Sequence, residues 1–306
     1  MHESVLAEYV RDGVIESKHF GHLIALDSSG APALIKGDPN ELIYPRSAIK
    51  SIQTSAMVRA GLDQEVRHLA IICASHSGSR THTEVALEIL KTAGLDETAL
   101  QCVKDRPIGV QERKDWGDQE PTRLAMNCSG KHAGMLATCV VNNWLIESYL
   151  DPTHPLQVAI REELETLSGE KVAKISVDGC GAPLFLLSLR GLANAFHKLA
   201  TSNDPIHKKV IAACLAFPEL VAGIGRGDTE LMKQVPGLFM KNGAEGVQSA
   251  FYKDGSTVFF KVSDGAERAH QVILQDAFGK MGIHFDVKHP EVLGGGKVIG
   301  EIRAVK

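Results

Sequence analysis

Residues 4–38, SVLAEYVRDGVIESKHFGHLIALDSSGAPALIKGD, carry the pattern that decides the fold. Apolar and β-branched residues recur along this stretch, and Ser-Ser-Gly at 28–30 is typical of a hairpin turn, so the stretch predicts β-strands. A second hairpin is predicted at Asp254-Gly255, followed by the return strand STVFFKV. Hairpins join antiparallel neighbours, and the sheet is therefore predicted to be largely antiparallel.

Helices are predicted between these groups of strands. After Pro45, residues 47–61 place apolar side chains at helical spacing and stop at a glycine. Further helices are predicted at 82–95, 132–146, 205–222 and from Ala266 onward. LAIICASHS, residues 69–77, is predicted as a short buried strand that runs into a polar turn. Residues 172–200 are predicted to run from a strand through a glycine turn into a helix.

The composition is that of one globular domain. The chain has 306 residues, of which 44% are hydrophobic and 23% charged, which is enough to bury a sizeable core. No Pro- or Ser-rich linker divides it, and no internal repeat is found. The prediction is a single α+β domain over residues 1–306, with a largely antiparallel sheet flanked by helices.

Charge and hydropathy exclude several classes of function. The net charge is −4 and no run of Lys and Arg forms a basic stripe, so nucleic acid is not expected as a partner. The first 22 residues lack the apolar region of a signal peptide, and no apolar run approaches the length of a membrane helix. We expect a cytoplasmic protein with no membrane partner, whose six cysteines are thiols or metal ligands.

A serine and a lysine lie three residues apart in Ser47-Ala48-Ile49-Lys50. On a helix, residues at this spacing share one face, about 5–6 Å apart at Cβ, so the amine can reach the hydroxyl. A neutral lysine can take the proton of a serine nucleophile. Ser-x-x-Lys is also common on solvated helix faces, and the pair alone does not decide between these interpretations.

Two further motifs contain candidate polar groups. Ser75-His76-Ser77 directly follows an apolar run, at a position where functional groups are often placed, although a Ser-rich turn can instead satisfy its own backbone. Lys261 stands in the strand FFKVSDG and could point into a cleft or, as is commoner, protect a strand edge.

Cys128 and Cys180 differ from the other four cysteines because both lie in polar, glycine-containing turns, NCSGKH and VDGCGAP. Thiolate, imidazole and carboxylate groups from two separated turns suit a zinc site, with Asp178 close to Cys180. Neither turn has a Cys-x-x-Cys pair, and two free thiols are the alternative.

Seven stretches in order, YPRSAIK, CASHSG, NCSGKH, VDGCGAP, GRGDTELM, GAEGV and FKVSDGAERA, resemble the motif series of the asparaginase II family, the rhizobial-type or class 3 L-asparaginases. The resemblance extends from about residue 20 to the end of the chain. It implies a fold similar to serine β-lactamases and serine-dependent glutaminases, hydrolysis of L-asparagine to aspartate and ammonia, and a homodimer.

The resemblance also implies site residues. Ser47 and Lys50 match a first Ser–Lys pair, and Ser75 and Lys261 a second, with Ser77 and Lys241 as rivals within that second pair. Cys128, Lys131 and Cys180 match the ligands of one Zn²⁺ per chain. Arg46, His76, Ser77 and Asp178 fall where substrate-binding residues are expected.

The expected mechanism is acyl transfer to Ser47 with Lys50 as the base, while the zinc holds the site and does not generate the nucleophile. Two alternatives stay open at this point. The chain could be a glutaminase or another β-lactamase-like serine amidohydrolase, or a non-catalytic zinc-binding or redox protein that uses Cys128 and Cys180 without Ser47.

Overall fold

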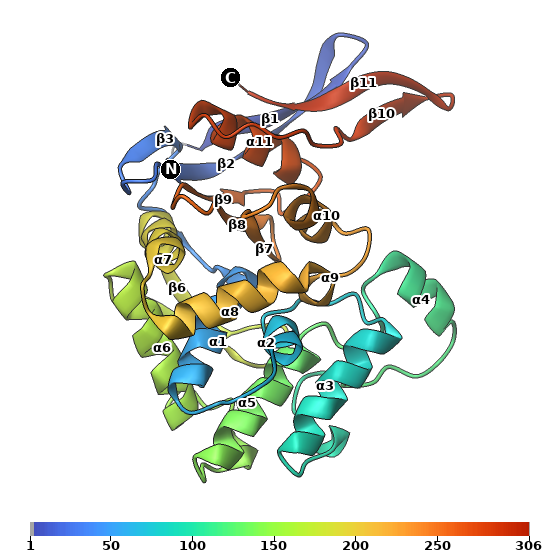
Figure 1. Ribbon diagram of the computed structural model, residues 1–306. Helices are drawn as coiled ribbons and strands as arrows, with labels where there is room; N and C mark the ends of the chain where they lie inside the picture. Colours follow the sequence, from blue (N-terminus) through green and yellow to red (C-terminus); the bar gives the residue numbers. More distant parts are fainter. Residues whose placement is uncertain (1–2, 306) are drawn as a thin grey trace.

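A computed structural model describes residues 3–305, and its largest element is an antiparallel sheet of eight strands in the order β10-β11-β1-β2-β9-β8-β7, with β3 pairing with β2 (Figure 1). A small second sheet has the order β4-β6-β5. The strands are β1 Ser4–Arg11, β2 Val14–Leu26, β3 Pro32–Lys36, β4 Leu42–Ile43, β5 Lys174–Val177, β6 Pro183–Ser188, β7 Phe239–Gly243, β8 Val247–Phe251, β9 Thr257–Val262, β10 Glu291–Gly294 and β11 Lys297–Ala304.

Eleven α-helices and three short 3₁₀-helices are described among residues 3–305. The α-helices are α1 Lys50–Arg59, α2 Val66–Ile72, α3 Arg80–Thr92, α4 Val110–Trp116, α5 Ser129–Val141, α6 Pro155–Ser168, α7 Leu189–Thr201, α8 Pro205–Ala216, α9 Pro218–Val221, α10 Gly227–Gln234 and α11 His270–Lys280. The 3₁₀-helices are η1 Arg46–Ile49, η2 Glu97–Ala99 and η3 Ile146–Ser148.

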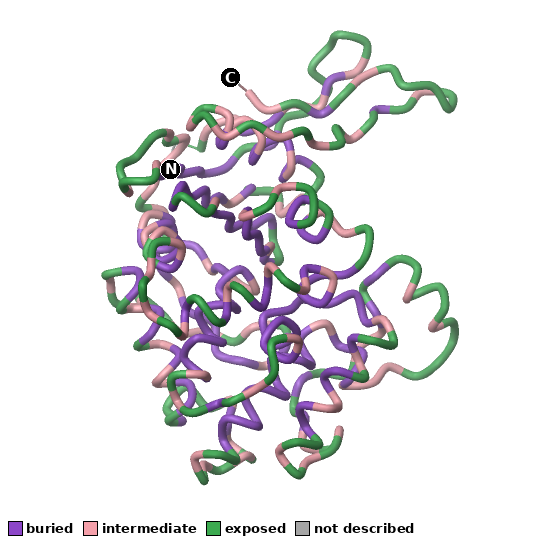
Figure 2. The backbone as a smooth tube through the Cα atoms, viewed as in Figure 1, coloured by how far each residue is buried: buried purple, intermediate pink, exposed green. Residues whose placement is uncertain are grey.

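Helices cover both faces of the central strands. Neighbouring residues of a strand point to opposite faces. In β9, Phe259 packs against Phe196 of α7, with ring centroids 5.6 Å apart, and Phe260 packs against His270 of α11 at 5.0 Å. The two helices therefore lie on opposite faces of the sheet, and β9 is buried along most of its length (Figure 2).

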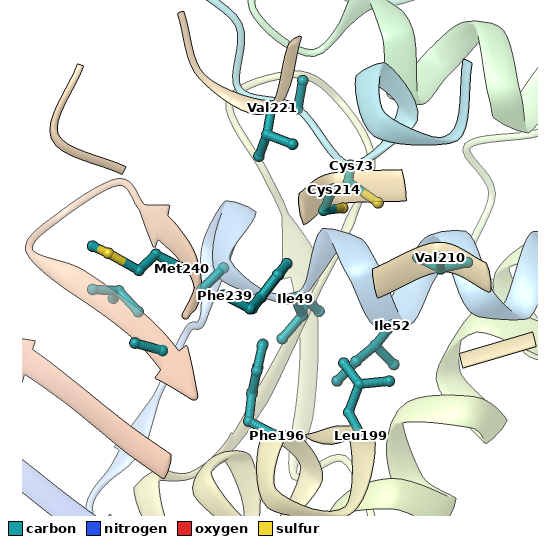
Figure 3. Packing of buried hydrophobic residues seen from close by; sticks show 14 of the residues in the cluster. Ile49, Ile52, Cys73, Phe196, Leu199, Val210, Cys214, Val221, Phe239 and Met240 are labelled. Atoms are coloured by element: carbon teal, nitrogen blue, oxygen red, sulfur yellow. The ribbon is translucent and has the colours of Figure 1, made fainter. Parts of the chain in front are cut away.

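The buried core connects the sheet to the start of α1. Phe196, Phe239 and Ile49 point toward one another, and Ile52 lies one turn further along α1 (Figure 3). Removing such a buried ring costs about 3–5 kcal/mol. This packing fixes η1 against β7, so the turn that carries Ser47 has a rigid support.

The predicted architecture is confirmed, with three local corrections. Residues 69–72, predicted as a strand, belong to helix α2, because a short apolar run buried on all sides has no period that separates the two states. Residues 183–188 form strand β6 before α7 begins. The last helix begins at His270 and not at Ala266. None of the described helices is both long and apolar enough to span a bilayer.

Candidate active site

A cavity of about 290 Å³ lies between η1, the segment after α2, the turn before α5, the turn after β5 and the end of β7. It brings together six of the predicted residues, Arg46, Ser47, Ser75, Cys128, Asp178 and Cys180. Its other lining residues are Val103, Asp105, Ile108, Met126, Asn127, Gly179, Arg226, Asn242, Ala244 and Glu267. We call it the catalytic cavity.

Ser47 follows a residue in an unusual backbone conformation. Arg46 has a φ of +53°, in the left-handed region that costs a non-glycine residue about 1–3 kcal/mol. Its Nε donates to Asp178 Oδ1 at 2.7 Å, which ties η1 to the turn after β5. Burial would raise the pKa of Asp178, but the charges of Lys131 and Arg46 outweigh it and lower the pKa, so Asp178 is a carboxylate. Surrounding contacts thus maintain the strained turn.

The end of β7 passes unusually close to this turn. A Cβ at Gly243 would lie 2.5 Å from the carbonyl oxygen of Pro45, so only glycine fits. β7 is the terminal strand of its sheet, and the N–H of Asn242 points outward to Asp228 Oδ2 at 2.8 Å. Ala244, the first residue of the turn after β7, lines the catalytic cavity.

Lys50 lies at the centre of the site with 1% of its surface exposed. Its Nζ donates to Ser75 Oγ at 3.1 Å, to Cys128 Sγ at 3.0 Å and to the carbonyl oxygen of Ala74. The lysine that sequence spacing pairs with Ser47 is thus hydrogen-bonded to the second predicted serine. Ser47 is half-buried on the cavity wall, whereas Ser75 is 7% exposed.

The segment of Ser75 is held by backbone hydrogen bonds on both sides. The N–H of Ser75 donates to Val221 O at 3.0 Å, and the N–H of His76 donates to Asn127 O at the same distance. Arg226 Nη1 donates to Ser75 O at 2.7 Å. Position 75 is therefore fixed from α9, from the turn before α5 and from the start of α10.

His76 and Ser77 were predicted to bind substrate, but neither lines the catalytic cavity. His76 is fully buried, shares a 2.9 Å hydrogen bond between Nε2 and Ser129 Oγ, and stacks on His82. Burial lowers its pKa well below the usual value, so it is a neutral core group. Ser77 Oγ donates to Ala222 O at 3.2 Å, away from the cavity. Both residues support Ser75 from behind.

The predicted zinc ligands converge beside Lys50. Lys131 Nζ donates to Cys180 Sγ at 3.3 Å, and Cys128, Lys131 and Cys180 are each at most 3% exposed. A hydrogen bond from Cys128, together with the charge of Lys131, lowers the pKa of Cys180 to about 5. The same hydrogen bond and burial raise the pKa of Cys128 to about 12. The set is a thiolate, a thiol and an ammonium group.

Of the two rival lysines, the structure places Lys241 and not Lys261 near this centre. Lys241, in β7, is fully buried, and its Nζ donates to Asn242 O and Oδ1. Burial and the nearby charge of Lys50 lower the pKa of Lys241 to about 7. Lys261 donates to the carbonyl oxygens of Glu245 and Val262 and lines a different cavity, with His22 and Tyr44. The structure does not bring Lys261 to Ser75.

Sequence reasoning missed several residues of the cavity wall, namely Asp105, Asn127, Arg226, Asn242 and Glu267. The GRGDTELM stretch was noted as a motif, but no role was assigned to its arginine or its aspartate. The signal that could have found Asn242 is its place beside Lys241 and Gly243, in a short polar break within an apolar strand.

The catalytic cavity thus places a buried lysine, Lys50, in hydrogen-bond contact with a serine, Ser75, beside an antiparallel sheet. The chain belongs to the L-asparaginase II family, whose model matches residues 7–304. Membership of this family suggests an amidohydrolase. No relative is found among curated protein sequences.

Distant likenesses exist among solved structures. Mglu in its tris and glutamate form is 12% identical with a TM-score of 0.48, and the match covers 94% of this chain and 65% of that one. A β-lactamase from Mycobacterium bovis is 14% identical with a TM-score of 0.44 and coverage of 80% and 88%. EstCE1, a hydrolase with promiscuous acyltransferase activity, is 12% identical with a TM-score of 0.42 and coverage of 84% and 92%. The chain spans 59% of Mglu in its native form.

Proposed function

We propose that the chain hydrolyses L-asparagine to L-aspartate and ammonia by acyl transfer to a serine. The observation that carries this proposal is the buried amine of Lys50, 3.1 Å from Ser75 Oγ and one helical turn after Ser47, on a cavity large enough for an amino acid. A Ser–Lys pair supplies nucleophile and base without further groups. Membership of the L-asparaginase II family supports the substrate.

Ser47 is the acyl carrier in this proposal. It is more exposed to the cavity than Ser75, and it stands in the first turn of η1, where free N–H groups favour negative charge. Lys50, in its neutral form, takes the Ser47 proton as Oγ attacks the amide carbon. Ser75, hydrogen-bonded to Lys50, passes that proton to the departing nitrogen. Water then hydrolyses the β-aspartyl ester.

The oxyanion of the tetrahedral intermediate needs donors on the cavity wall. The backbone N–H of Ser47 and that of Ala244 at the end of β7 are suited to this role, because Gly243 lets the strand approach η1 closely. Removing one such donor raises the activation free energy by about 2.7–4 kcal/mol. Two donors together therefore stabilise the transition state by several kcal/mol.

Arg46 and Asp178 are suited to hold the charged end of the amino acid. Their ion pair spans 2.7 Å on the cavity wall, with one guanidinium for the α-carboxylate and one carboxylate for the α-ammonium. Opposite charges presented side by side match a zwitterion. This pair therefore supports a free amino acid as substrate in preference to a neutral amide.

Zinc remains a proposal for Cys128, Lys131 and Cys180. The two converging cysteines supply soft sulfur donors of the kind that zinc accepts, and Lys131 supplies a nitrogen, while residues 3–305 contain no group of three Cys, His, Asp or Glu suited to a metal. Zinc bound there would act as a template and polarise the substrate carbonyl. Lys131 and Cys128 must each release a proton to bind it, so occupancy should fall as pH falls.

The deciding experiment measures the ammonia that the purified protein releases from L-asparagine and from L-glutamine. The same protein is tested for opening of the ring of a penicillin, and its metal content is analysed in parallel. We expect asparagine turnover to dominate. A dominant glutamine or penicillin activity would replace asparagine as the substrate, and no turnover of any amide would favour the non-catalytic alternative. The predicted homodimer is tested by the mass in solution.

A further inference from the structure

A second cavity, of about 310 Å³, adjoins the catalytic cavity and shares Arg226, Asn242 and Glu267 with it. Its remaining lining residues are Gly227, Asp228, Met240, Gln248, Arg268, His270, Gln271 and Pro290. It lies between α10, β7 and the start of α11, on the side of Asn242 away from Arg46 and Asp178. Ammonia needs about the room of one water molecule, so this space is far larger than an ammonia product requires.

The floor of the second cavity is a buried carboxylate. Asp228 is 7% exposed and accepts hydrogen bonds from the N–H of Asn242 at 2.8 Å and from Gln248 Nε2 at 3.5 Å. Both donors are neutral, and within residues 3–305 Asp228 forms no salt bridge, although the buried Lys241 lies near enough for its charge to interact with this carboxylate. A buried carboxylate is costly unless a cation neutralises it. The cavity side of Asp228 is where a ligand cation would fit.

A neighbouring buried group also points to a missing partner. His270 is 6% exposed and lines the same cavity; its Nδ1 is 3.1 Å from Gln248 Oε1, while its Nε2 has no hydrogen-bond partner in the described chain. Burial lowers the pKa of His270 to about 3, so the ring is neutral and does not repel a cation.

The two arginines of the wall direct their hydrogen bonds elsewhere. Arg226 donates to Ser75 O, and Arg268 donates to His19 Nε2 and Ser17 Oγ and lies over the ring of Tyr9. Glu267 at the shared wall is exposed and forms no salt bridge within residues 3–305. Both guanidinium groups stay charged, but the carboxylates of Asp228 at the floor and Glu267 at the wall are the groups of this cavity that can accept hydrogen bonds from a ligand ammonium.

We infer that the second cavity is a leaving-group subsite, which accepts the amine portion of N4-substituted asparagine amides and selects amines that carry a second, cationic nitrogen. This inference rests on the proposed function. With the amino-acid end held at Arg46 and Asp178 and the amide carbon at Ser47, a substituent on the amide nitrogen passes Asn242 and reaches Asp228.

The chemistry balances as for asparagine itself. The Ser47 Oγ–carbon bond forms, the carbon–nitrogen bond breaks, and the serine proton leaves on the nitrogen as a free amine R–NH₂ in place of ammonia. Water then cleaves the ester to aspartate and restores the serine. No additional reactant is needed.

The test compares two isosteric amides, N4-(4-aminobutyl)-L-asparagine and N4-pentyl-L-asparagine, by the aspartate each releases. A charge-assisted hydrogen bond to a buried carboxylate corresponds to about a tenfold or larger preference in kcat/KM for the aminobutyl compound. In Asp228→Asn this ratio should fall to about threefold or less. Glu230→Gln, an exposed carboxylate on the same helix that does not line the cavity, is the matched control and should keep the ratio.

A second variant covers the case in which Asp228→Asn does not fold. Gln271→Glu adds a carboxylate to the cavity wall and should raise the ratio, whereas Gln271→Lys should lower it. Equal ratios in these two variants overturn the charge selection. Turnover of asparagine without cleavage of the aminobutyl amide overturns the subsite alone, while absence of asparagine turnover overturns the proposed function and this inference with it.

Discussion

The two walls of the catalytic cavity are built in different ways. On the helical wall, functional side chains contact one another: Lys50 is hydrogen-bonded to Ser75 and Cys128, and Lys131 to Cys180. On the wall formed by β7 and the start of α10, which we call the strand wall, the corresponding groups bond mainly to backbone, as Lys241 does to Asn242 O and Arg226 does to Ser75 O. Side chains that share partners are energetically coupled, and those that do not are nearly additive.

The comparison teaches where substitutions should act together. A change on the helical wall removes a partner from several groups at once, so combined changes there should cost less than the sum of the single ones. Changes on the strand wall should couple to the helical wall only through the charge of Lys50 near Lys241 and the hydrogen bond from Arg226 to Ser75 O.

The largest effect is expected for Ser47→Ala. It removes the proposed nucleophile and should lower asparagine turnover by about three orders of magnitude or more, measured as kcat at saturating substrate. Ser51→Ala is the control, because the buried Ser51 hydroxyl, on the next turn, has no hydrogen-bond partner in the described chain and its loss should leave kcat unchanged. Turnover of Ser47→Ala within about tenfold of wild type would exclude Ser47 as the acyl carrier.

Lys50→Arg should be nearly as damaging as Lys50→Met, with about a hundredfold or greater loss of kcat. Arginine keeps the positive charge but cannot release its proton, so it cannot act as a base. Adding Ser75→Ala to either variant should cost little more, because both residues belong to one coupled set. If Lys50→Arg retains substantial activity at pH 7, residue 50 is needed only for its positive charge, and the base that activates the serine must be another residue.

Lys241→Met tests the strand wall through stability. The pKa of Lys241 is lowered to about 7 in the folded chain, so between about pH 7 and 10 the unfolded chain binds more protons and the free energy of unfolding rises with pH. From pH 6.5 to 8.5 this group contributes a rise of about 2 kcal/mol. Denaturant titration of wild type and Lys241→Met at both pH values should show that rise in the wild type only. An equal rise in the free energy of unfolding of both proteins would show that a group other than Lys241 titrates in this range.

The smallest effect is expected for Cys180→Ala. If the proposed zinc site exists, the change should abolish zinc binding and raise KM about tenfold while changing kcat less, because in the proposal the zinc orients the substrate and is not the source of the nucleophile. Metal analysis and steady-state kinetics on the same preparation measure both quantities. Cys139→Ala, a buried cysteine of α5 that does not line the cavity, is the control for loss of a thiol. Loss of kcat with KM unchanged would make the metal catalytic.

Sequence reasoning found the helical wall because its residues are local. Ser47 and Lys50 are one turn apart on a helix, so spacing alone predicts that they share one face, whereas Lys131 was assigned through the resemblance to the family. The hydrogen bond of Lys50 to Ser75, in place of the Ser47 that spacing pairs with it, could not be predicted, because it depends on how α2 packs against α1. The positive φ of Arg46 also has no signal in the sequence.

The strand wall was found only in the structure. Asp228 and Asn242 are joined by a backbone hydrogen bond that follows from the position of β7 at the sheet edge, and no local pattern predicts that edge. The sequence could not decide between Lys241 and Lys261 for the same reason. Both are strand lysines in apolar surroundings, and only the order of β7, β8 and β9 shows which one faces η1.

The pairing of β1 with β11 has a consequence for synthesis of the chain. Ala7 of β1 lies opposite Ala304 of β11. This edge of β1 can therefore be covered only after β11, which is translated much later, has been made. At about 5–20 residues per second this interval is tens of seconds. During it, β1 presents unpaired backbone that other chains could join. Until residues 297–304 have left the ribosome, β1 can pair with β2, and its other edge stays open.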